Sequence, residues 1–266
     1  MRQGPSVLAR PSHVRETAGR ARCAAMLAGA AFCLIGAGLI GVAMPTQGVA
    51  QTYLDGRTLQ QAPDFIIKRY EAKAAAGDAR AQFFLGLMNE QGLIGDAPDD
   101  AAARQWFKTA ANAGYPPAHY KLAVFLEEGR GGLKDMKGAV RHYQAAAKAG
   151  LSEAQYNAGL MLAEGRGVAR DVRAGIRWLE QAALAGVVSA QFSLAELYSA
   201  GVGIPVDLVE AWAWLRRAAE AGDTGQAGDA SRLLALLEKR MDADERAEAL
   251  ALKAAHDSLA TIQREQ

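Results

Sequence analysis

A repeat of 36 residues constrains the fold of this chain more than any other feature of its sequence. In each repeat a glycine closes an alanine-rich run, and an aspartate and a tryptophan or histidine recur at the same interval. These positions are Gly114, Gly150, Gly186 and Gly222; Asp99, Asp135, Asp171 and Asp207; and Trp106, His142, Trp178 and Trp214. One additional residue lies in the central loop of the first unit, so four units cover residues 79–222. Such a period is typical of solenoids, in which each unit packs on its neighbours.

Each unit is expected to form two helices. The first helix, for example residues 154–164, places Ala154, Ala158 and Met161 on one face, which is the i, i+4, i+7 spacing of a buried helical stripe. A glycine ends this helix because glycine readily adopts the left-handed conformation that terminates helices. These glycines are Gly92, Gly129, Gly165 and Gly201. The aspartate after each loop can cap the second helix by accepting a hydrogen bond from a free backbone N–H group.

The second helix of each unit carries an Ala-Ala pair and one position of the column Trp106, His142, Trp178 and Trp214, named here the tryptophan column. Small side chains such as Ala110 and Ala111 allow two helix backbones to approach closely. We expect the tryptophan column to fill the spaces between helix layers as part of the core. His142 is then expected to be a partly buried spacer.

Helical segments flank the four units. Residues 51–78 are assigned as a linker and a degenerate half-repeat, because residues 65–77 resemble a second helix that ends at Gly77. Residues 223–266 are expected to form capping helices, over 229–240 and 242–255, with the charged surface that an array end exposed to water requires. The predicted fold is therefore all-α, a right-handed α-α superhelix (solenoid) of about five stacked helix pairs with a C-terminal helical cap.

Residues 1–50 have the features of an export signal. Five arginines precede an uncharged apolar run over residues 23–44, and two small residues, Gly48 and Ala50, occupy the −3 and −1 places of a cleavage site. The segment is either a signal peptide cleaved after Ala50 or an uncleaved anchor, since the run is long enough to span a bilayer. A buried core helix is the third alternative, and the absence of charge in the run disfavours it. The basic flank would stay in the cytoplasm, which places the repeats in the periplasm, free or anchored to the inner membrane by residues 23–44.

Cysteine content and charge narrow the function classes. Both cysteines, Cys23 and Cys33, lie within the leader, so the rest of the chain has neither disulfides nor thiol chemistry. The formal net charge is +1, but the residues after position 50 carry 25 basic and 28 acidic side chains. This mildly acidic body gives no indication of a nucleic-acid partner, and contact with a membrane is expected only through the N-terminal segment.

The repeat resembles that of the Sel1-like family, relatives of the tetratricopeptide repeats. The third unit carries the resemblance most fully, and the second departs from it with His142 in the tryptophan place and Ala123 in a glycine place. The matching residues of the third unit are Ala154, Gly159, Gly165, Gly167, Val168, Asp171, Trp178, Ala182, Ala183 and Gly186. The resemblance covers residues 65–255 and implies a protein–protein interaction scaffold or adaptor. The alternative is a cell-envelope hydrolase or peptidoglycan-binding protein on the same fold, although the hydrolase members have paired cysteines that this body lacks.

No residues are assigned to catalysis, to a cofactor or to a metal. The loops at residues 129–132 and 165–168 are rich in glycine but do not match the phosphate-binding pattern G-x-x-x-x-G-K-[ST], and their recurrence with the repeat favours turns. The histidines after the leader, His119, His142 and His256, are far apart in sequence and show no metal-ligand spacing.

A candidate partner groove follows from the positions that vary between units. In the first helices, the place after the aromatic residue varies freely, as Phe84, Lys121, Asn157 and Ser193. In tetratricopeptide-like arrays the first helices line the concave side, where a peptide or helix of another protein docks. We therefore predict a groove through His119, Lys121, Asn157 and Ser193, with Phe84 as an apolar anchor. The alternative is that this variation marks an idle, solvated face.

Overall fold

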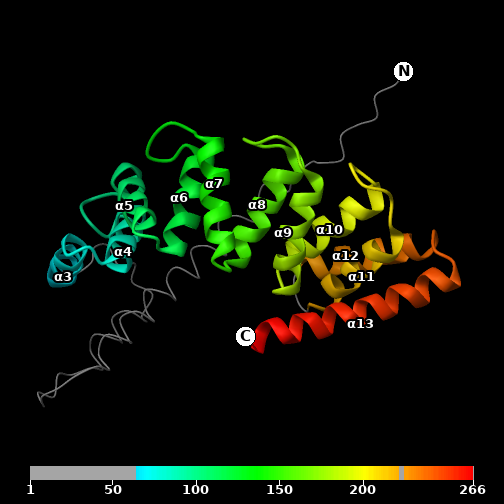
Figure 1. Cartoon of the computed structure of the whole chain (residues 1–266). Helices are drawn as coiled ribbons and strands as arrows, with labels where there is room; N and C mark the ends of the chain where they lie inside the picture. Colours follow the sequence, from blue (N-terminus) through cyan, green and yellow to red (C-terminus); the bar gives the residue numbers. More distant parts are fainter. Residues whose placement is uncertain (1–63, 222–224, 266) are drawn as a thin grey trace, which may run out of the picture. The chain divides into compact units, whose positions relative to one another are not determined.

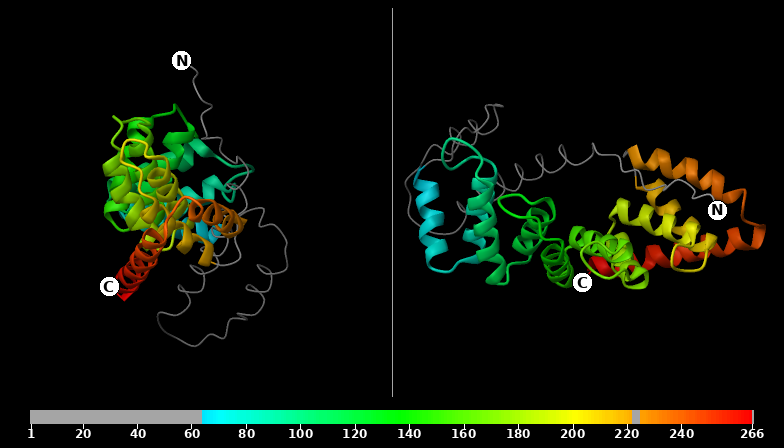
Figure 2. Two further views of the ribbon diagram at one scale, coloured as in Figure 1. Left: turned by 90° about the vertical axis from the view of Figure 1, so that its right-hand side faces the viewer. Right: turned by 90° about the horizontal axis from the view of Figure 1, so that it is seen from above.

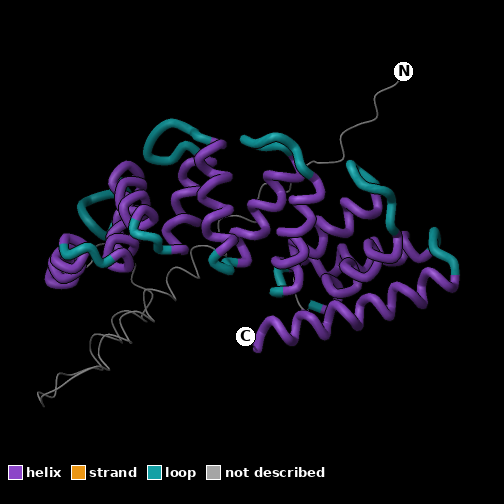
Figure 3. Tube along the Cα trace, in the orientation of Figure 1, coloured by secondary structure: helices purple, strands orange, loops and turns teal. Residues whose placement is uncertain are grey.

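The computed structural model describes residues 64–221 and 225–265. Within these ranges the chain is entirely helical, with no strand (Figure 1 and Figure 3). The helices are α3 (Asp64–Ala75), α4 (Ala79–Glu90), α5 (Asp100–Asn112), α6 (Pro116–Glu128), α7 (Met136–Lys148), α8 (Ser152–Glu164), α9 (Val172–Leu184), α10 (Val188–Ala200), α11 (Leu208–Glu220), α12 (Gly225–Glu238) and α13 (Ala243–Glu265). The prediction of an all-α fold is confirmed.

Consecutive helices form the units of a solenoid. The first and second helices of the four units pair as α4 with α5, α6 with α7, α8 with α9, and α10 with α11. Each second helix also packs on the first helix of the next unit, and α3 packs on α4 as the second helix of a half-repeat would. Stacking of neighbours buries the apolar stripe that one helix pair alone would leave exposed.

The helix ends follow the residues that the sequence marks for them. The aspartates at positions 99, 135, 171 and 207 each accept a hydrogen bond from the backbone N–H group three residues later, at 2.8–3.0 Å. Three of the first helices end at a left-handed glycine, with φ of 78° at Gly129, 74° at Gly165 and 65° at Gly201. An N-cap of this kind stabilises a helix by about 1 kcal/mol, so the repeated aspartate helps to set each boundary.

Helix backbones approach each other closely in the third unit. A Cβ atom added to Gly159 of α8 would lie 2.9 Å from the carbonyl oxygen of Gly175 in α9, and one added to Gly175 would lie 2.7 Å from that of Gly159. The alanine pairs at 110/111, 146/147 and 182/183 are all buried at the contacts between layers. The expectation that small residues allow close helix contacts is therefore confirmed.

The core column is not the one that the sequence indicates. Trp106 and Trp178 are only half-buried, and the fully buried side chains come one residue later in each second helix. These are Phe107, Tyr143, Leu179 and Leu215. One residue turns the side chain by about 100° around a helix. The interpretation of the tryptophan column as core was thus wrong for two of its members, and it holds for Trp214, which is 1% exposed.

The C-terminal helices extend and then fold back along the array. The second of them, α13, is longer than expected and ends at Glu265. It packs along α11 and reaches α9, which are the second helices of the fourth and third units (Figure 2). It thus covers part of the second-helix face, here meaning the side of the array formed by α5, α7, α9 and α11.

The leader lies outside the described residues. Between residues 64 and 265, apart from the gap at 222–224, no helix is long and apolar enough to cross a membrane.

Candidate functional site

The predicted apolar anchor is buried inside the array. Phe84 is 7% exposed, and its ring lies 5.4 Å from that of Tyr70 in α3. The Arg80 guanidinium group and the ring of neighbouring Phe83 lie 5.6 and 5.9 Å from its ring centroid. Because α3 covers this side of α4, Phe84 stabilises the first unit and is not available to a partner.

His119 and Lys121 lie on different sides of α6. They are two residues apart, which corresponds to about 200° around a helix. Lys121 reaches back to α4, where its Nζ atom donates to Glu90 at 2.8 Å. His119 instead contacts His142 of α7, so the structure does not place the predicted five residues in one groove.

The remaining two predicted residues stay accessible. Asn157 in α8 and Ser193 in α10 are both half-buried, and neither side chain makes a hydrogen bond within the described part of the chain. Together with Lys121 they occupy equivalent places on three successive first helices. We call these three residues the first-helix face.

Arginines in the loops link each unit to the one before it. Arg130 donates to Glu90 at 2.9 Å and to Asp100 at 2.5 and 3.0 Å, and these contacts raise its pKa above the ordinary value. One unit later, Arg166 donates to Glu127 at 2.7 Å and also pairs with Glu164. Half-buried pairs with several hydrogen bonds are more specific in geometry than single surface pairs.

In the fourth unit, the loop arginine and the acidic residue that pairs with it are replaced together. The place of Arg130 and Arg166 is taken there by Val202, and the matching acidic place is taken by Ala163. Both charges are therefore lost in the same interface. Such paired replacement identifies the charges as part of repeat stacking, not as a site for a ligand.

The glycine-rich loops also serve stacking. Gly167 lies so close to α7 that a Cβ atom there would be 2.5 Å from the Met136 carbonyl oxygen, and a Cβ atom on Gly131 would overlap the Asp100 carbonyl oxygen. Both glycines contact the start of the second helix in the preceding unit. This arrangement agrees with the interpretation of the loops as turns.

A buried glutamine joins the first helix of most units to the preceding helix. In each case the side-chain amide donates to a backbone carbonyl eight residues earlier, at 3.0–3.3 Å. The pairs are Gln82 with Ala74, Gln155 with Ala147, and Gln191 with Ala183. His119 replaces this glutamine in the second unit, and the equivalent carbonyl, that of Ala111, acts to raise its pKa against the larger lowering by burial.

His119 and His142 form a pair that the sequence does not reveal. Their Nδ1 atoms are 2.8 Å apart and their ring centroids 5.1 Å apart. One Nδ1 must therefore donate a proton to the lone pair of the other. Burial, with added repulsion from His119 and Arg141, lowers the pKa of His142 to about 4, and burial also lowers that of His119.

This pair should make the protein less stable in mild acid. The folded state holds the pKa of His142 below its ordinary value, so the unfolded chain binds more protons as the pH falls from about 6.5 towards 4. The stability that depends on this pair is fully present above pH 6.5 and is lost progressively below it. After allowance for partial solvent exposure, we expect a loss of about 1–2 kcal/mol in unfolding free energy.

The measurement is urea unfolding between about pH 7.5 and 4.5, the range that brackets the ordinary histidine pKa, for the native chain and for the variant His119→Gln/His142→Trp. The variant restores the residues found in the third unit, Gln155 and Trp178, and it leaves the other ionisable groups in place. Parallel pH profiles for the two proteins would contradict the assignment.

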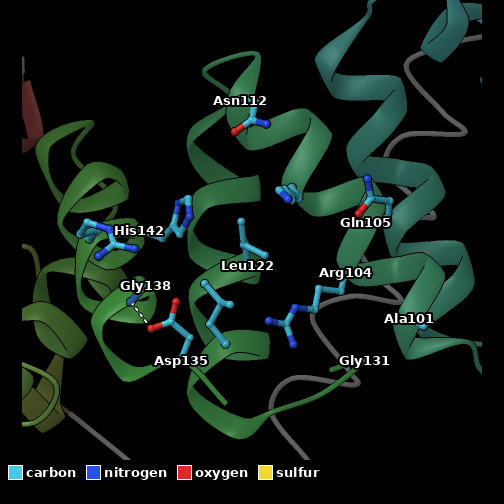
Figure 4. A pocket seen from close by; sticks show the side chains of 12 residues that line it. Ala101, Arg104, Gln105, Asn112, Leu122, Gly131, Asp135, Gly138 and His142 are labelled. Atoms are coloured by element: carbon cyan, nitrogen blue, oxygen red, sulfur yellow. Dashed lines mark hydrogen bonds between the residues drawn. The ribbon is translucent and has the colours of Figure 1, made fainter. Parts of the chain in front are cut away.

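A cavity of about 380 Å³ opens beside this histidine pair, between α5 and α7 (Figure 4). Its floor is Leu122 and Leu126 of α6, which are buried. The walls are mostly polar, with three cationic side chains (Arg104, Lys108 and Arg141) and one carboxylate (Asp135). They include Arg104, Gln105, Lys108 and Asn112 from α5, and Asp135, Arg141 and His142 at or in α7. We call this cavity the α5–α7 groove.

The described residues hold no cluster of three or more histidine, cysteine, aspartate or glutamate side chains that could bind a metal ion. The two histidines of the pair contact each other through their Nδ1 atoms.

Comparison with known proteins gives a family but no curated relative. The Sel1 repeat matches residues 79–115, 116–151, 152–187 and 188–223. A Sel1 repeat protein from Oxalobacter formigenes superposes with a TM-score of 0.56 at 28% identity, over 64% of this chain and 73% of that one. A protective antigen of uropathogenic Escherichia coli with the SLR fold has a TM-score of 0.43 at 26% identity, over 75% of this chain and 51% of that one. No curated protein matches the sequence.

The family match coincides with the structural units. Each matched segment contains one helix pair, from α4 with α5 to α10 with α11, and together the four segments cover more than half of the chain. Sel1 repeat proteins are typically scaffolds for protein–protein interaction. The chain belongs to the Sel1 repeat family.

Proposed function

We propose that this protein is an exported scaffold that binds another protein and performs no catalysis itself. The observation that supports this proposal is the separation of two roles among the residues of each unit. Alanines, glycines, buried glutamines and the loop arginines hold the units together, while outward positions differ from unit to unit on the same regular frame. A frame of this kind presents a set of side chains at fixed spacing to a partner.

The first-helix face is one such set. Lys121, Asn157 and Ser193 follow one another on α6, α8 and α10, and all three are partly accessible. Lys121 already pairs with Glu90, but Arg130 also binds that carboxylate, so Glu90 keeps a partner when the lysine turns to a ligand. This face accordingly suits a polar segment of a partner protein.

Export is proposed from the leader. The arginine-bearing flank and the apolar run at residues 23–44 favour placement of the repeats beyond the cytoplasmic membrane, as a periplasmic protein or tethered by that run. Intact-mass analysis of the protein from fractionated cells checks this step. A mature chain that starts at residue 51, or a full chain in the inner-membrane fraction, agrees with export; a full chain in the cytoplasm contradicts it.

The binding function is tested by chemical crosslinking in cell envelopes, with tagged full-length protein and identification of the captured proteins by mass spectrometry. We expect one dominant partner that is absent from a tagged control of unrelated sequence. Capture at the control level, together with turnover of nitrocefin or binding to purified sacculi, would contradict the scaffold proposal. Lys121→Ala and Asn157→Ala should reduce capture if the first-helix face is the contact.

A further inference from the structure

We propose that the α5–α7 groove binds an acidic amphipathic helix of a partner protein, in the same way that α11 and α9 bind α13. This inference rests on the proposed scaffold function and adds the surface and the chemistry of the partner. It concerns the second-helix face, which the sequence did not indicate as a binding surface.

The chain itself shows how a helix docks on the second-helix face. The imidazole ring of His256 in α13 stacks on Trp214 of α11, with ring centroids 4.0 Å apart and an interplanar angle of 19°. Ion pairs flank this contact, between Arg217 and Asp257 and between Glu220 and Lys253, the latter at 2.6 Å. A flat side chain below and charges along the edge thus form the docking site for a helix.

The α5–α7 groove has the same construction two units earlier. His142 stands 72 residues before Trp214 and takes its place in the tryptophan column. Its ring lies against His119. His142 and Leu122 of α6 both line the groove (Figure 4). No helix of the described chain covers this groove, whereas α13 covers Trp214.

The charges of the groove select an acidic helix. Lys148 lies on α7 outside the residues that line the groove, at the place that Glu220 occupies in α11. A helix docked in the register of α13 would meet Lys148 with the residue equivalent to Lys253, so this residue must carry a negative charge. Lys108 and Arg141 are exposed on the two walls and form no hydrogen bond or ion pair with the described residues. Charge complementarity of this kind sets the choice of partner and the rate of encounter.

The same charges disfavour α13 of a second copy as the occupant. Docked in the register seen on α11, its Lys253 would face Lys148, and two like charges would meet beside the groove. The occupant is therefore a helix with carboxylates at this position, together with apolar residues for the leucine floor.

A pair of synthetic peptides tests the inference with defined probes. Fluorescent peptides with the sequence of residues 243–265, one native and one carrying Lys253→Glu, are titrated with the full chain, and anisotropy is recorded at low and physiological salt. We expect the Lys253→Glu peptide to bind about fivefold more tightly than the native peptide, as one surface charge contact allows. The preference should weaken at high salt.

Variants of the full chain place the peptide in the groove. Lys148→Glu should reverse the preference between the two peptides, and Lys108→Glu/Arg141→Glu should weaken binding of the Lys253→Glu peptide about tenfold, as two lost charge contacts allow. Lys239→Glu, at an exposed site after α12, is the matched control and should change nothing. An unchanged preference in Lys148→Glu, or no saturable binding of either peptide up to about 1 mM, overturns the inference.

Failure of the inference and failure of the scaffold proposal give different results. If crosslinking captures a partner that is lost with Lys121→Ala/Asn157→Ala but kept with Lys108→Glu/Arg141→Glu, the scaffold stands and the groove assignment falls. If no partner is captured and neither peptide binds, both fall. Loss of the partner only with the groove variant, together with the reversed peptide preference, supports the inference.

Discussion

Replacement of Trp214 with alanine should lower the unfolding free energy by about 3–5 kcal/mol, the cost typical of removing a buried tryptophan. Trp214 is 1% exposed and is enclosed between α11 and α13, where His256 stacks on its ring and the Arg217 guanidinium group lies 5.8 Å from the ring centroid. Removal of the indole leaves a cavity and also takes away the surface on which α13 docks. Urea unfolding gives the free energy, and hydrogen exchange of residues 243–265 reports the release of α13.

Two buried ionisable groups near the tryptophan favour the release of α13. Burial, with added repulsion from Asp207, raises the pKa of Glu210 to about 7, and burial lowers the pKa of His256 to about 4. Both groups therefore favour their neutral forms in the folded protein. When α13 detaches, water reaches them and they ionise near neutral pH, which further favours the open state.

Trp106→Ala is the matched control for this prediction. Trp106 holds the same place in the first unit, but it is half-buried and no helix of the described chain covers it as α13 covers Trp214. We expect its replacement to cost about 1–2 kcal/mol, without faster exchange in residues 243–265. Equal losses for the two variants would show that α13 contributes little to the burial of Trp214.

The contrast between these tryptophans also shows what the sequence could reveal. The period of 36 residues identified the helix pairs, the aspartate caps and the glycine ends, because each depends on residues close together in the chain or in the next unit. Interactions between nearest neighbours repeat with the sequence, so one unit explains the others. The end of α3 shortly before Gly77 and the role of Ala182/Ala183 could be predicted for the same reason.

Features that occur once could not be predicted in this way. The return of α13 across α11 and α9 has no counterpart in the repeat, so nothing in the pattern marks Trp214 as different from Trp178. The contact between His119 and His142 joins two departures from the repeat on different helices. The sequence did contain a signal, because both histidines replace the usual residue within the second unit. Their contact depends on the direction of the two side chains, which the period alone does not give.

The prediction of a single groove failed for a related reason, since its residues lie on different sides of the array. Variation between units marked Phe84, His119 and Lys121 as outward positions, yet variation also occurs where a neighbour differs. Phe84 varies because α3, a half-repeat, lies over it, and His119 varies together with His142. A column of variable residues therefore indicates a binding face only where the surrounding units are complete.

The second large effect is expected from Gly131→Ala, with a loss of about 2–5 kcal/mol in unfolding free energy. The backbone at Gly131 has φ of 63°, a left-handed conformation that costs a residue with a side chain about 1–2 kcal/mol. In addition, the new methyl group would overlap the backbone carbonyl of Asp100 at the start of α5. Overpacking against backbone typically lowers the unfolding free energy by a further amount of about 1–3 kcal/mol, because the loop must move away from the preceding unit.

Gly114→Ala separates the two causes of this loss. Gly114 has φ of 81° but no atom within 4 Å of an added Cβ, so its replacement should cost only about 1–2 kcal/mol. Urea unfolding of both variants measures the difference, which is the part that belongs to contact between units. If the two alanine variants are equally stable, position 131 requires glycine only because of its left-handed backbone conformation. The close contact between the loop and α5 would then not contribute to the loss.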